Sequence, residues 1–545
     1  MKKSTTAIIL LVVLALSLSL MAGCTQTQTS TTGSAGGTTT TKATGGTTTT
    51  AGNEPAANLT YWVALNSNVA ATAASYNDVP MFVELMKRTN VNVEFQHPPV
   101  GQENEQFNLM INSMELPDII ESNWIAYPGG PEKAVNDEVI LSLNDILDDK
   151  AVYLKTYYQN NPNIDKLVKT DSGIYYSFPF IRGDAFLMVY GGAQMRQDWL
   201  DELDLEVPTT IDEWDSVLKA TKEAKNLDYA LTFTVGNIKE PTYGSLFLST
   251  YGVLYNFYVD PASNEIKYGP MQDGYKEALS LLARWYDEGL LDPDFASQDG
   301  TTYDAKITGG KVTAFFALTG SGLGRYTTTV RPENPEFTLV GVPWPTVNKG
   351  DTPIAGQKDH AYSGAASAAI TSQCEDVDAA VRFLDYHYSD EGHMLLNFGI
   401  EGESYTMVDG YPTYTDLIKK NPDGLSMAHA AGRYVRSVYG GPFVQDKRYM
   451  EQYLQYPEQV NAINTWSQHQ GKLIVPPLTP TPEESQKMAA IMSEINTFVD
   501  EMFLKFIMGQ EPLDKFADFV AQIERMKISE ALEIQNTALE RFNNR

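Results

Sequence analysis

The chain has 545 residues, 43% of them hydrophobic, and a formal charge of −29 at pH 7. A chain this acidic repels phosphate backbones, which excludes nucleic acid as a partner. It has two cysteines, too few for a disulfide framework, so its stability must come from buried apolar area.

The first 24 residues have the pattern of an export signal. Lys2 and Lys3 precede an apolar run over 7–20, which has the length of a signal-peptide core rather than of a membrane span. Met21-Ala22-Gly23-Cys24 follows and resembles the lipobox of bacterial lipoproteins, with methionine in place of the usual leucine. We therefore expect residues 1–23 to be a lipoprotein signal peptide, Cys24 to carry the lipid, and the body to work on the extracytoplasmic face of the cell membrane. An uncleaved signal anchor is the alternative.

Residues 24–57 are almost wholly Thr, Gly, Ser, Ala and Gln, without apolar periodicity. Such a composition predicts a disordered tether. About 30 residues of flexible coil span roughly 30 Å r.m.s., enough to let a folded body move above a lipid surface. Loss of the two leader lysines lowers the formal charge of the mature chain from −29 to −31.

From residue 58 the pattern is typical of an α/β fold. Apolar residues alternate over 59–65, which indicates a strand, and a helix is expected over 78–89. A strand over 91–95, a helix over 102–114 and a strand over 117–120 follow. Alternation of this kind predicts parallel pairing with ligands beyond the carboxyl ends of the strands.

Three helices in the middle of the chain have clear boundary signals. Thr210 and Glu213 have capping-box spacing ahead of a helix to 224. A second helical repeat runs over 275–286 and ends at Gly289, and a third runs from 377 to a stop at Gly392. Their periodicity makes Trp214 and Trp285 core residues rather than ligand contacts. Cys374, beside the start of the third helix, is expected to be a buried, inert thiol.

Several strings occur in an order and at spacings that resemble one known family. They are LPDII (116–120), GIYYSFPF (173–180), MRQDWLDELDLEVPTTIDEW (195–214), WYDEGLLDPDF (285–295) and DYHYSDEGHMLLNFGIEGESYTMVDG (385–410), followed by a helical tail. Together they resemble the family 1 extracellular solute-binding proteins, and among these the LplA-type lipoproteins of carbohydrate ABC transporters.

The resemblance implies an α/β fold of the type II periplasmic-binding-protein class, with two α/β lobes joined by a hinge and a helical C-terminal tail. By analogy, lobe one would comprise about 58–180 and 312–370, and lobe two about 181–311 and 371–545. The implied function is capture of a carbohydrate, an oligosaccharide, between the lobes and its delivery to membrane permease subunits, by a monomer without cofactors. A receptor of the same fold that feeds a sensor kinase or captures a peptide remains an alternative.

Many members of this family carry an acidic calcium loop after the helix that here spans 210–224. This chain has LKATKEAKNLDYALTFT there, with Asp228 as the one acidic oxygen donor after the helix. Calcium takes six or more oxygens, so we expect no metal at this position.

An enzyme is the competing class. The sequence contains no H-E-x-x-H, C-x-x-C or G-x-S-x-G motif, and its six histidines are scattered without ligand spacing. A glycosidase needs two carboxylates across a sugar, but among 69 acidic residues some pair always qualifies. We therefore expect no enzyme and no catalytic residue, with a lipid-anchored carbohydrate-cleaving enzyme as the alternative.

A sugar presents apolar faces and a rim of hydroxyls, so its receptor needs flat aromatic side chains and polar partners. Position and residue type together select the candidates, with Trp124 the strongest because Asn123 and Tyr127 flank it. Glu401 and Tyr405 are included because they mark the family, and they either touch ligand or brace a lobe. An acidic sugar would need cationic partners such as Arg182, Arg325, Arg433 and Arg436, although arginines on a chain this acidic more often pair with its own carboxylates. The predicted ligand-binding residues are Trp62, Asn66, Asn123, Trp124, Arg182, Tyr243, Tyr251, Phe316, Ser321, Trp344, Glu401 and Tyr405.

Overall fold

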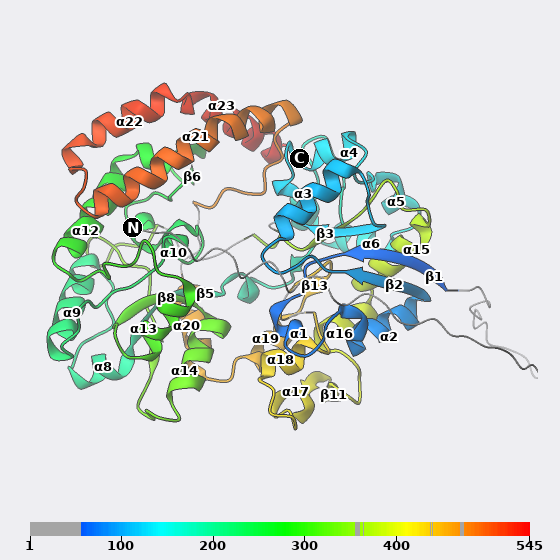
Figure 1. Ribbon diagram of the computed structural model, residues 1–545, viewed down its shortest axis with the longest axis horizontal. Coiled ribbons are helices and arrows are strands. Elements are labelled where there is room, and N and C mark those ends of the chain that lie inside the picture. Colours follow the sequence, from blue (N-terminus) through cyan, green and yellow to red (C-terminus); the bar gives the residue numbers. More distant parts are fainter. Residues whose placement is uncertain (1–55, 355–359, 363, 437, 439, 469–472) are drawn as a thin grey trace, which may run out of the picture. The chain divides into compact units, whose positions relative to one another are not determined.

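The computed structural model describes residues 56–354, 360–362, 364–436, 438, 440–468 and 473–545, and Ala56–Arg545 form one compact unit. The predicted signal peptide, Cys24 and nearly all of the tether lie outside these residues. Two α/β lobes make up the body (Figure 1). Among the described residues no helix is both long and apolar enough to cross a membrane.

Lobe one is built on a four-stranded sheet in the order β10-β3-β1-β2. The predicted parallel pairing is confirmed, since β1 pairs in parallel with both β2 and β3, while β10 is antiparallel to β3. Alternating burial along β2 matches the period of two in its sequence. The strands are β1 (Ala57–Trp62), β2 (Val91–Gln96), β3 (Ile119–Ser122) and β10 (Ser367–Ile370).

Helices cover this sheet, and a hairpin with two short helices extends the lobe. The helices predicted over 78–89 and 102–114 are confirmed, with ends that differ by at most two residues. The elements are α1 (Ser67–Ala70), α2 (Pro80–Thr89), α3 (Glu103–Ser113), α4 (Gly130–Asn136), α5 (Asn144–Asp149), α6 (Val152–Asn160), α7 (Pro162–Leu167), α15 (Val377–Asp385), α16 (Asp390–Phe398), β11 (Tyr405–Val408), β12 (Tyr411–Tyr414), α17 (Asp416–Lys419) and α18 (Met427–Gly432).

The helix predicted from 377 begins where expected, but its predicted stop at Gly392 is wrong. The chain forms α15, a short 3-10 turn (Tyr386–Tyr388) and then α16, with Gly392 in the first turn of the new helix. Ser389 starts α16 because its hydroxyl accepts a hydrogen bond from the Gly392 N–H. A Cβ at Gly392 would lie 1.8 Å from the Tyr386 carbonyl oxygen, so close packing rather than helix termination requires glycine here.

Lobe two has a three-stranded antiparallel sheet in the order β8-β5-β9, with a separate β6-β7 hairpin. Phe316 of β8 faces Ala193 of β5, and Val340 of β9 faces Met195. The strands are β5 (Gly191–Arg196), β6 (Phe257–Asp260), β7 (Glu265–Tyr268), β8 (Ala314–Leu318) and β9 (Leu339–Gly341).

The helices of lobe two begin and end largely as the sequence predicts. Thr210 and Glu213 form the expected capping box of α9, and Gly289, with φ of 64°, follows the end of α12. Trp214 and Trp285 are fully buried, which confirms them as core residues. The helices are α8 (Gln197–Glu202), α9 (Ile211–Ala224), α10 (Val235–Lys239), α11 (Leu246–Ser249), α12 (Asp273–Asp287), α13 (Gly300–Thr308), α14 (Arg325–Val330), α20 (Pro457–Trp466), α21 (Pro482–Ile507), α22 (Phe516–Arg525) and α23 (Ile528–Asn543).

The expected division of the chain between the lobes needs correction. Residues 314–344 pair with β5 and share its core, so they lie in lobe two rather than lobe one. Residues 377–398 share the core of β1 and β2, and the hairpin region packs beside them, so they lie in lobe one. Local periodicity could not reveal this, because the strands that meet are more than 100 residues apart.

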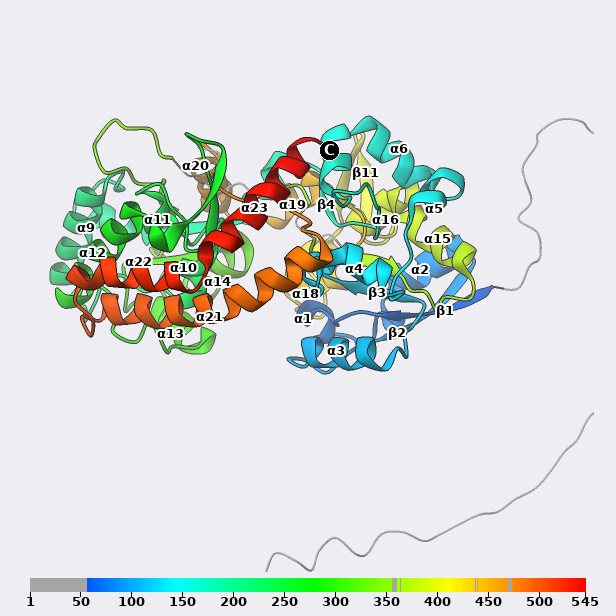
Figure 2. The same ribbon diagram turned by 90° about the horizontal axis from the view of Figure 1, so that it is seen from above.

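The chain crosses between the lobes at short intervals. Leu187 packs in lobe one and Val189, two residues later, in lobe two, which puts this crossing beyond the predicted boundary at 180. Other crossings follow β9 and α19 (Lys447–Tyr453), and a further one precedes α21. Near the first of them β4 (Ile181–Arg182) pairs in parallel with β13 (Val444–Gln445). Figure 2 shows α22 beside one end of the 26-residue helix α21, and α23 leading from there to the C-terminus.

Two buried titratable groups lie in lobe one. Cys374 is 8% exposed and burial raises the pKa of its thiol to about 12, in line with the expected inert cysteine. His387 is 2% exposed, its Nδ1 lies 2.9 Å from the Pro442 carbonyl oxygen, and burial lowers its pKa to about 3.

His387 predicts an acid-sensitive component of stability. In the unfolded chain the imidazole takes up a proton below about pH 6.5, whereas the folded protein resists protonation until about pH 3. Stability is therefore present above pH 6.5 and declines as the pH falls toward 3, by up to about 1.4 kcal/mol per pH unit. Urea unfolding at pH 7.5, 5.5 and 4.5 should show a shallower decline for His387→Asn, with His429→Asn on α18 as the control. Equal declines in all three proteins would contradict the assignment.

Candidate functional site

The carboxyl ends of β1 and β3 form one wall of the candidate site. Trp62, the last residue of β1, is half-buried, with its ring centroid 6.0 Å from that of Phe107 on α3. Asn123, directly after β3, is exposed. The structure thus brings an accessible indole and an accessible amide to the same edge of the sheet, as parallel pairing predicts.

Asn66 has a local structural role at this edge. Its side-chain oxygen accepts a hydrogen bond from the Asn68 N–H at 2.9 Å and caps α1. Its own N–H donates to the Tyr76 hydroxyl at 3.2 Å. Asn66 therefore fixes the backbone beyond β1, with its amide oxygen already bonded.

Trp124 lies in the core rather than on the wall. It is 0% exposed and packs with Ile120, Tyr127 and Tyr176, and its ring is 5.8 Å from that of Phe107. The sequence correctly places Trp124 after β3, but the 3-10 turn at 124–126 directs its indole into the core. In this structure Trp124 supports Phe107, and through it Trp62, without presenting a face to solvent.

A second wall of the candidate site is formed around Arg182, where the chain passes from lobe one to lobe two. Its guanidinium lies 5.2 Å from the ring centroid of Tyr190, and its Nη1 donates to the His360 carbonyl at 3.3 Å. Tyr190 is edge-on to Tyr243 at 6.0 Å, and its hydroxyl is 2.9 Å from the Thr242 hydroxyl. The predicted Arg182 and Tyr243 are thus brought together.

Tyr190 and Phe180 were missed in the sequence, although both flank Arg182 within FPFIRGDAFLMVY. Phe180 also packs within cation–π distance of Arg182, at 5.9 Å. The signal that could have found them is their proximity to a lobe crossing, where aromatic side chains remain half-buried instead of entering either core.

The other predicted residues are not gathered at these walls. Phe316 and Trp344 are 1% and 4% exposed in the lobe-two core, against which Tyr251 also packs. Ser321 is exposed, and its carbonyl accepts a hydrogen bond from Arg325 Nε at 2.6 Å.

Glu401 and Tyr405, the two candidates taken from the family resemblance, differ in their surroundings. Tyr405 is 5% exposed and packs on Phe398, so it braces lobe one, while Glu401 is exposed.

A cavity of about 270 Å³ adjoins Ile125, two residues after Asn123. It is lined by Ile125, His360 and Tyr362, by residues 474–478 of the last crossing, and by Gln535 of α23. A larger one, of about 600 Å³, lies at the opposite edge of the lobe-one sheet, beside Thr89 and the start of β2. Charged residues on its rim pair with each other or with neighbours, as in Lys150–Asp378, so its size alone does not mark a ligand site.

A buried group of Arg436, Glu121 and Tyr61, here called the node, supports the lobe-one wall that carries Trp62 and Asn123. Arg436 Nη2 lies 2.6 and 2.9 Å from the two carboxylate oxygens of Glu121 on β3, and the Tyr61 hydroxyl donates to Glu121 at 2.8 Å. Arg436 is 2% exposed and Glu121 is 8% exposed. Burial and the nearby Glu121 carboxylate raise the pKa of Tyr61 well above its usual value. Since Tyr61 precedes Trp62 and Glu121 lies two residues before Asn123, the node positions both.

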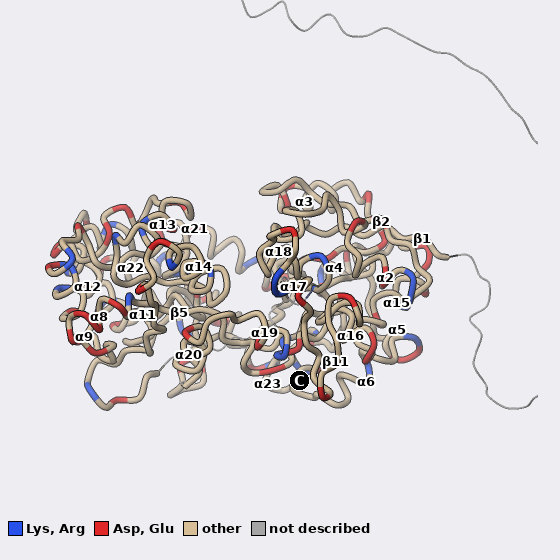
Figure 3. Tube along the Cα trace, turned by 90° about the horizontal axis from the view of Figure 1, so that it is seen from below, with Lys and Arg blue, Asp and Glu red and all other residues tan. Residues whose placement is uncertain are grey.

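Two of the arginines that are candidates for an acidic sugar pair with carboxylates of the chain itself. Arg436 is paired with Glu121, and Arg325 lies 2.8 Å from Asp304. Acidic and basic residues are interspersed over both lobes (Figure 3). In the part of the chain described, no group of three or more His, Cys, Asp or Glu side chains is arranged to hold a metal ion.

The node gives a double-mutant prediction. Arg436→Met leaves the Glu121 carboxylate buried and unpaired, so we expect about 3–5 kcal/mol of destabilisation in urea unfolding. Arg436→Met with Glu121→Gln removes both charges and should be less destabilised than Arg436→Met alone. A double variant at least as unstable as the single one would show that the pairing is not what matters.

Comparison with known proteins places the chain in a family. A model of the bacterial extracellular solute-binding protein matches residues 73–394, more than half of the chain. The chain belongs to this family. One relative of this binding protein is lipoprotein LipO of Bacillus subtilis (strain 168), 26% identical over 63% of this chain and 66% of LipO. Another is the fructooligosaccharide ABC transporter substrate-binding protein FusA of Streptococcus pneumoniae serotype 4, 22% identical over 86% of this chain and 87% of FusA.

Solved structures confirm the two-lobed fold of the binding protein. The alginate-binding protein AlgQ2 without calcium ion superposes with a TM-score of 0.71 at 20% identity, over 90% of this chain and 99% of AlgQ2. A solute-binding protein of Bifidobacterium longum infantis ATCC 15697, described as binding HMO, gives 0.73 at 18% identity, over 90% and 99%.

Proposed function

We propose that the protein is the substrate-binding lipoprotein of an ABC importer, which captures an oligosaccharide between its lobes and delivers it to a membrane permease. The observation that carries this is that accessible aromatic and polar groups lie on both lobes: Trp62, Asn123 and Arg182 on lobe one, and Tyr190 and Tyr243 on lobe two. Aromatic faces suit the apolar faces of a sugar, and amide or guanidinium groups suit its hydroxyls.

The relatives support a carbohydrate as the ligand class. FusA is named for fructooligosaccharides, and YtcQ of Bacillus subtilis, 26% identical over 42% of this chain, is named for polygalacturonan and rhamnogalacturonan. Lobes that close on a sugar gain contacts absent from the open form, and this difference in affinity shifts the equilibrium toward closure. Exclusion of water then strengthens the hydrogen bonds to the sugar.

Binding without turnover is the direct test. Calorimetric titration of the purified full-length protein with fructo-oligosaccharides and with oligogalacturonates should show one-to-one binding of one class, and chromatography should recover that sugar unchanged. Trp62→Ala and Tyr243→Ala should each weaken binding by about 1.5 kcal/mol, or roughly tenfold, because apolar contact area is lost. Tyr153→Ala, at an exposed position on α6, is the control. Released shorter sugars would favour a carbohydrate-cleaving enzyme, and binding of neither class would oppose the proposal.

The lipid anchor is a separate part of the proposal, since it rests on the sequence pattern at Met21–Cys24. In bacteria, Cys24→Ser should abolish incorporation of labelled palmitate and leave the leader uncleaved. Mass spectrometry of the membrane-bound protein should find the modification at residue 24 of the unaltered chain. An unaltered chain that begins at Met1 without lipid would indicate the uncleaved signal anchor.

A further inference from the structure

The last helix, α23, is joined to lobe two over its first half. Ile528 and Ala531 belong to the lobe-two core, which also contains residues of α12 and α21. The Asn536 side chain accepts a hydrogen bond from the Ile266 N–H at 2.8 Å and donates to the Ile266 carbonyl at 3.0 Å, which attaches α23 to β7. This half of the helix therefore moves with lobe two.

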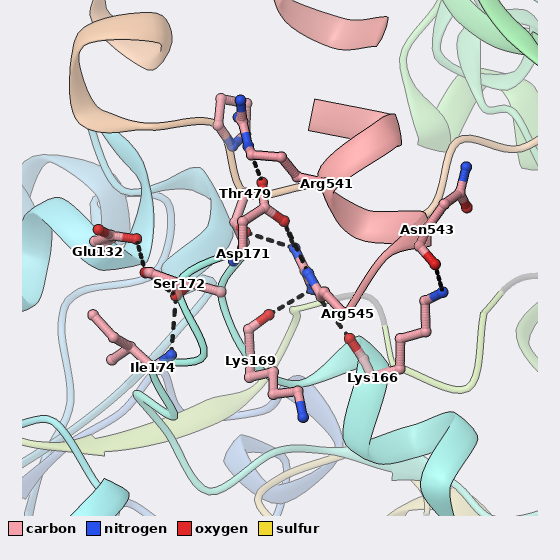
Figure 4. A network of polar contacts seen from close by, with 12 residues as sticks. Glu132, Lys166, Lys169, Asp171, Ser172, Ile174, Thr479, Arg541, Asn543 and Arg545 are labelled. Carbon is pink, nitrogen blue, oxygen red and sulfur yellow. Dashed lines mark hydrogen bonds and ion pairs between the residues drawn. The ribbon is translucent and has the colours of Figure 1, made fainter. Parts of the chain in front are cut away.

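The other end of α23 is held by lobe one. Arg541 Nε lies 2.7 Å from Asp171, and Arg545 donates to the same carboxylate at 2.9 and 2.5 Å (Figure 4). Asp171 follows α7 of lobe one. The side chain of Asp171 is 8% exposed and that of Arg545 is 2% exposed, so these charges are shielded from water.

Further contacts surround the Asp171 carboxylate. Arg545 also donates to the backbone carbonyls of Lys166 and Lys169, at 3.1 and 2.5 Å, and to the Thr479 hydroxyl at 2.7 Å. Arg541 also bonds Glu484 at the start of α21, a helix of lobe two, so two guanidiniums meet one carboxylate from each lobe. We call this group of Asp171, Glu484, Arg541 and Arg545 the clamp.

An apolar seam lies next to the clamp. Phe542 and Leu539 pack with Leu478 and with Ile266 of β7 in lobe two, and Leu167 of α7 in lobe one packs against them. Removing one partner from a buried ion pair costs about 3–5 kcal/mol, so the end of α23 is expected to stay on lobe one when the lobes move. A 16-residue helix is a rod of about 24 Å that cannot lengthen.

We propose that α23 is a strap between the lobes, and that the clamp at Asp171 limits how far they open and thereby sets the ligand affinity. The regulation of the site rests on the proposed function, whereas the mechanical restraint does not. A strap fixed at both ends restricts the open states. Releasing one end gives the open protein more conformations, so the binding-competent fraction falls and the apparent Kd rises by the same factor. Gln535 of the strap lines the cavity that includes Ile125, which connects it to the site wall.

The test uses the full-length protein with graded release of the clamp. Arg545→Lys keeps the charge but loses the forked contact, and Arg541→Gln with Arg545→Gln removes both guanidiniums. Arg525→Gln on α22, whose side chain bonds Gln522 at an exposed position, is the matched control. Circular dichroism and urea unfolding establish which variants remain folded.

Small-angle scattering should show a larger radius for the free double variant and an unchanged radius with saturating sugar. Its Kd should rise roughly tenfold, with a smaller rise for Arg545→Lys and none for Arg525→Gln. A folded clamp variant with the radius and Kd of the unaltered protein overturns the proposal. If the double variant does not fold, Arg545→Lys decides by the same two readouts. Should no sugar bind at all, the proposed function fails while the radius of the free protein still tests the strap.

Discussion

Each lobe has to bury its own apolar residues, and this constraint determines what is left between them. The cores around β1 and around β5 take up most of the large apolar side chains, including Trp124, Trp344 and Phe316. What remains at the crossings is half-buried aromatic rings, amides and guanidiniums, as at Arg182 and Tyr190. Such groups can exchange water for a polar ligand with little loss of hydrogen bonding.

Buried ion pairs position structural elements at two places in the body. Arg436 and Glu121 lie beneath the ends of β1 and β3, and the clamp joins α23 to lobe one. In each case a guanidinium reaches a carboxylate distant in sequence and fixes its direction through several hydrogen bonds. Buried pairs of this kind add less to stability than to the choice of one arrangement, and a receptor that must present two matching walls depends on that choice.

The sequence predicts the local elements well because they depend on local rules. Alternating apolar residues predicted β1 and β2, and the Thr210–Glu213 capping box predicted the start of α9. The division of segments between lobes was not predictable in this way, since pairing of β5 with β8 and β9 joins residues more than 100 positions apart. The break between α15 and α16 was missed because the capping serine, Ser389, lies inside a continuous amphipathic pattern.

The location of the candidate site residues was predictable, but their burial was not. Parallel strands correctly placed Trp62 and Asn123 at one edge, yet the same rule selected Trp124, whose indole turns inward. Residue type does not tell on which side of a turn an aromatic ring packs. A crystal structure of the protein with its oligosaccharide tests the account most directly. It should show the sugar in contact with Trp62, Asn123 or Arg182 of lobe one and with Tyr190 or Tyr243 of lobe two. A sugar held by one lobe alone, or at a surface remote from both walls, would contradict it.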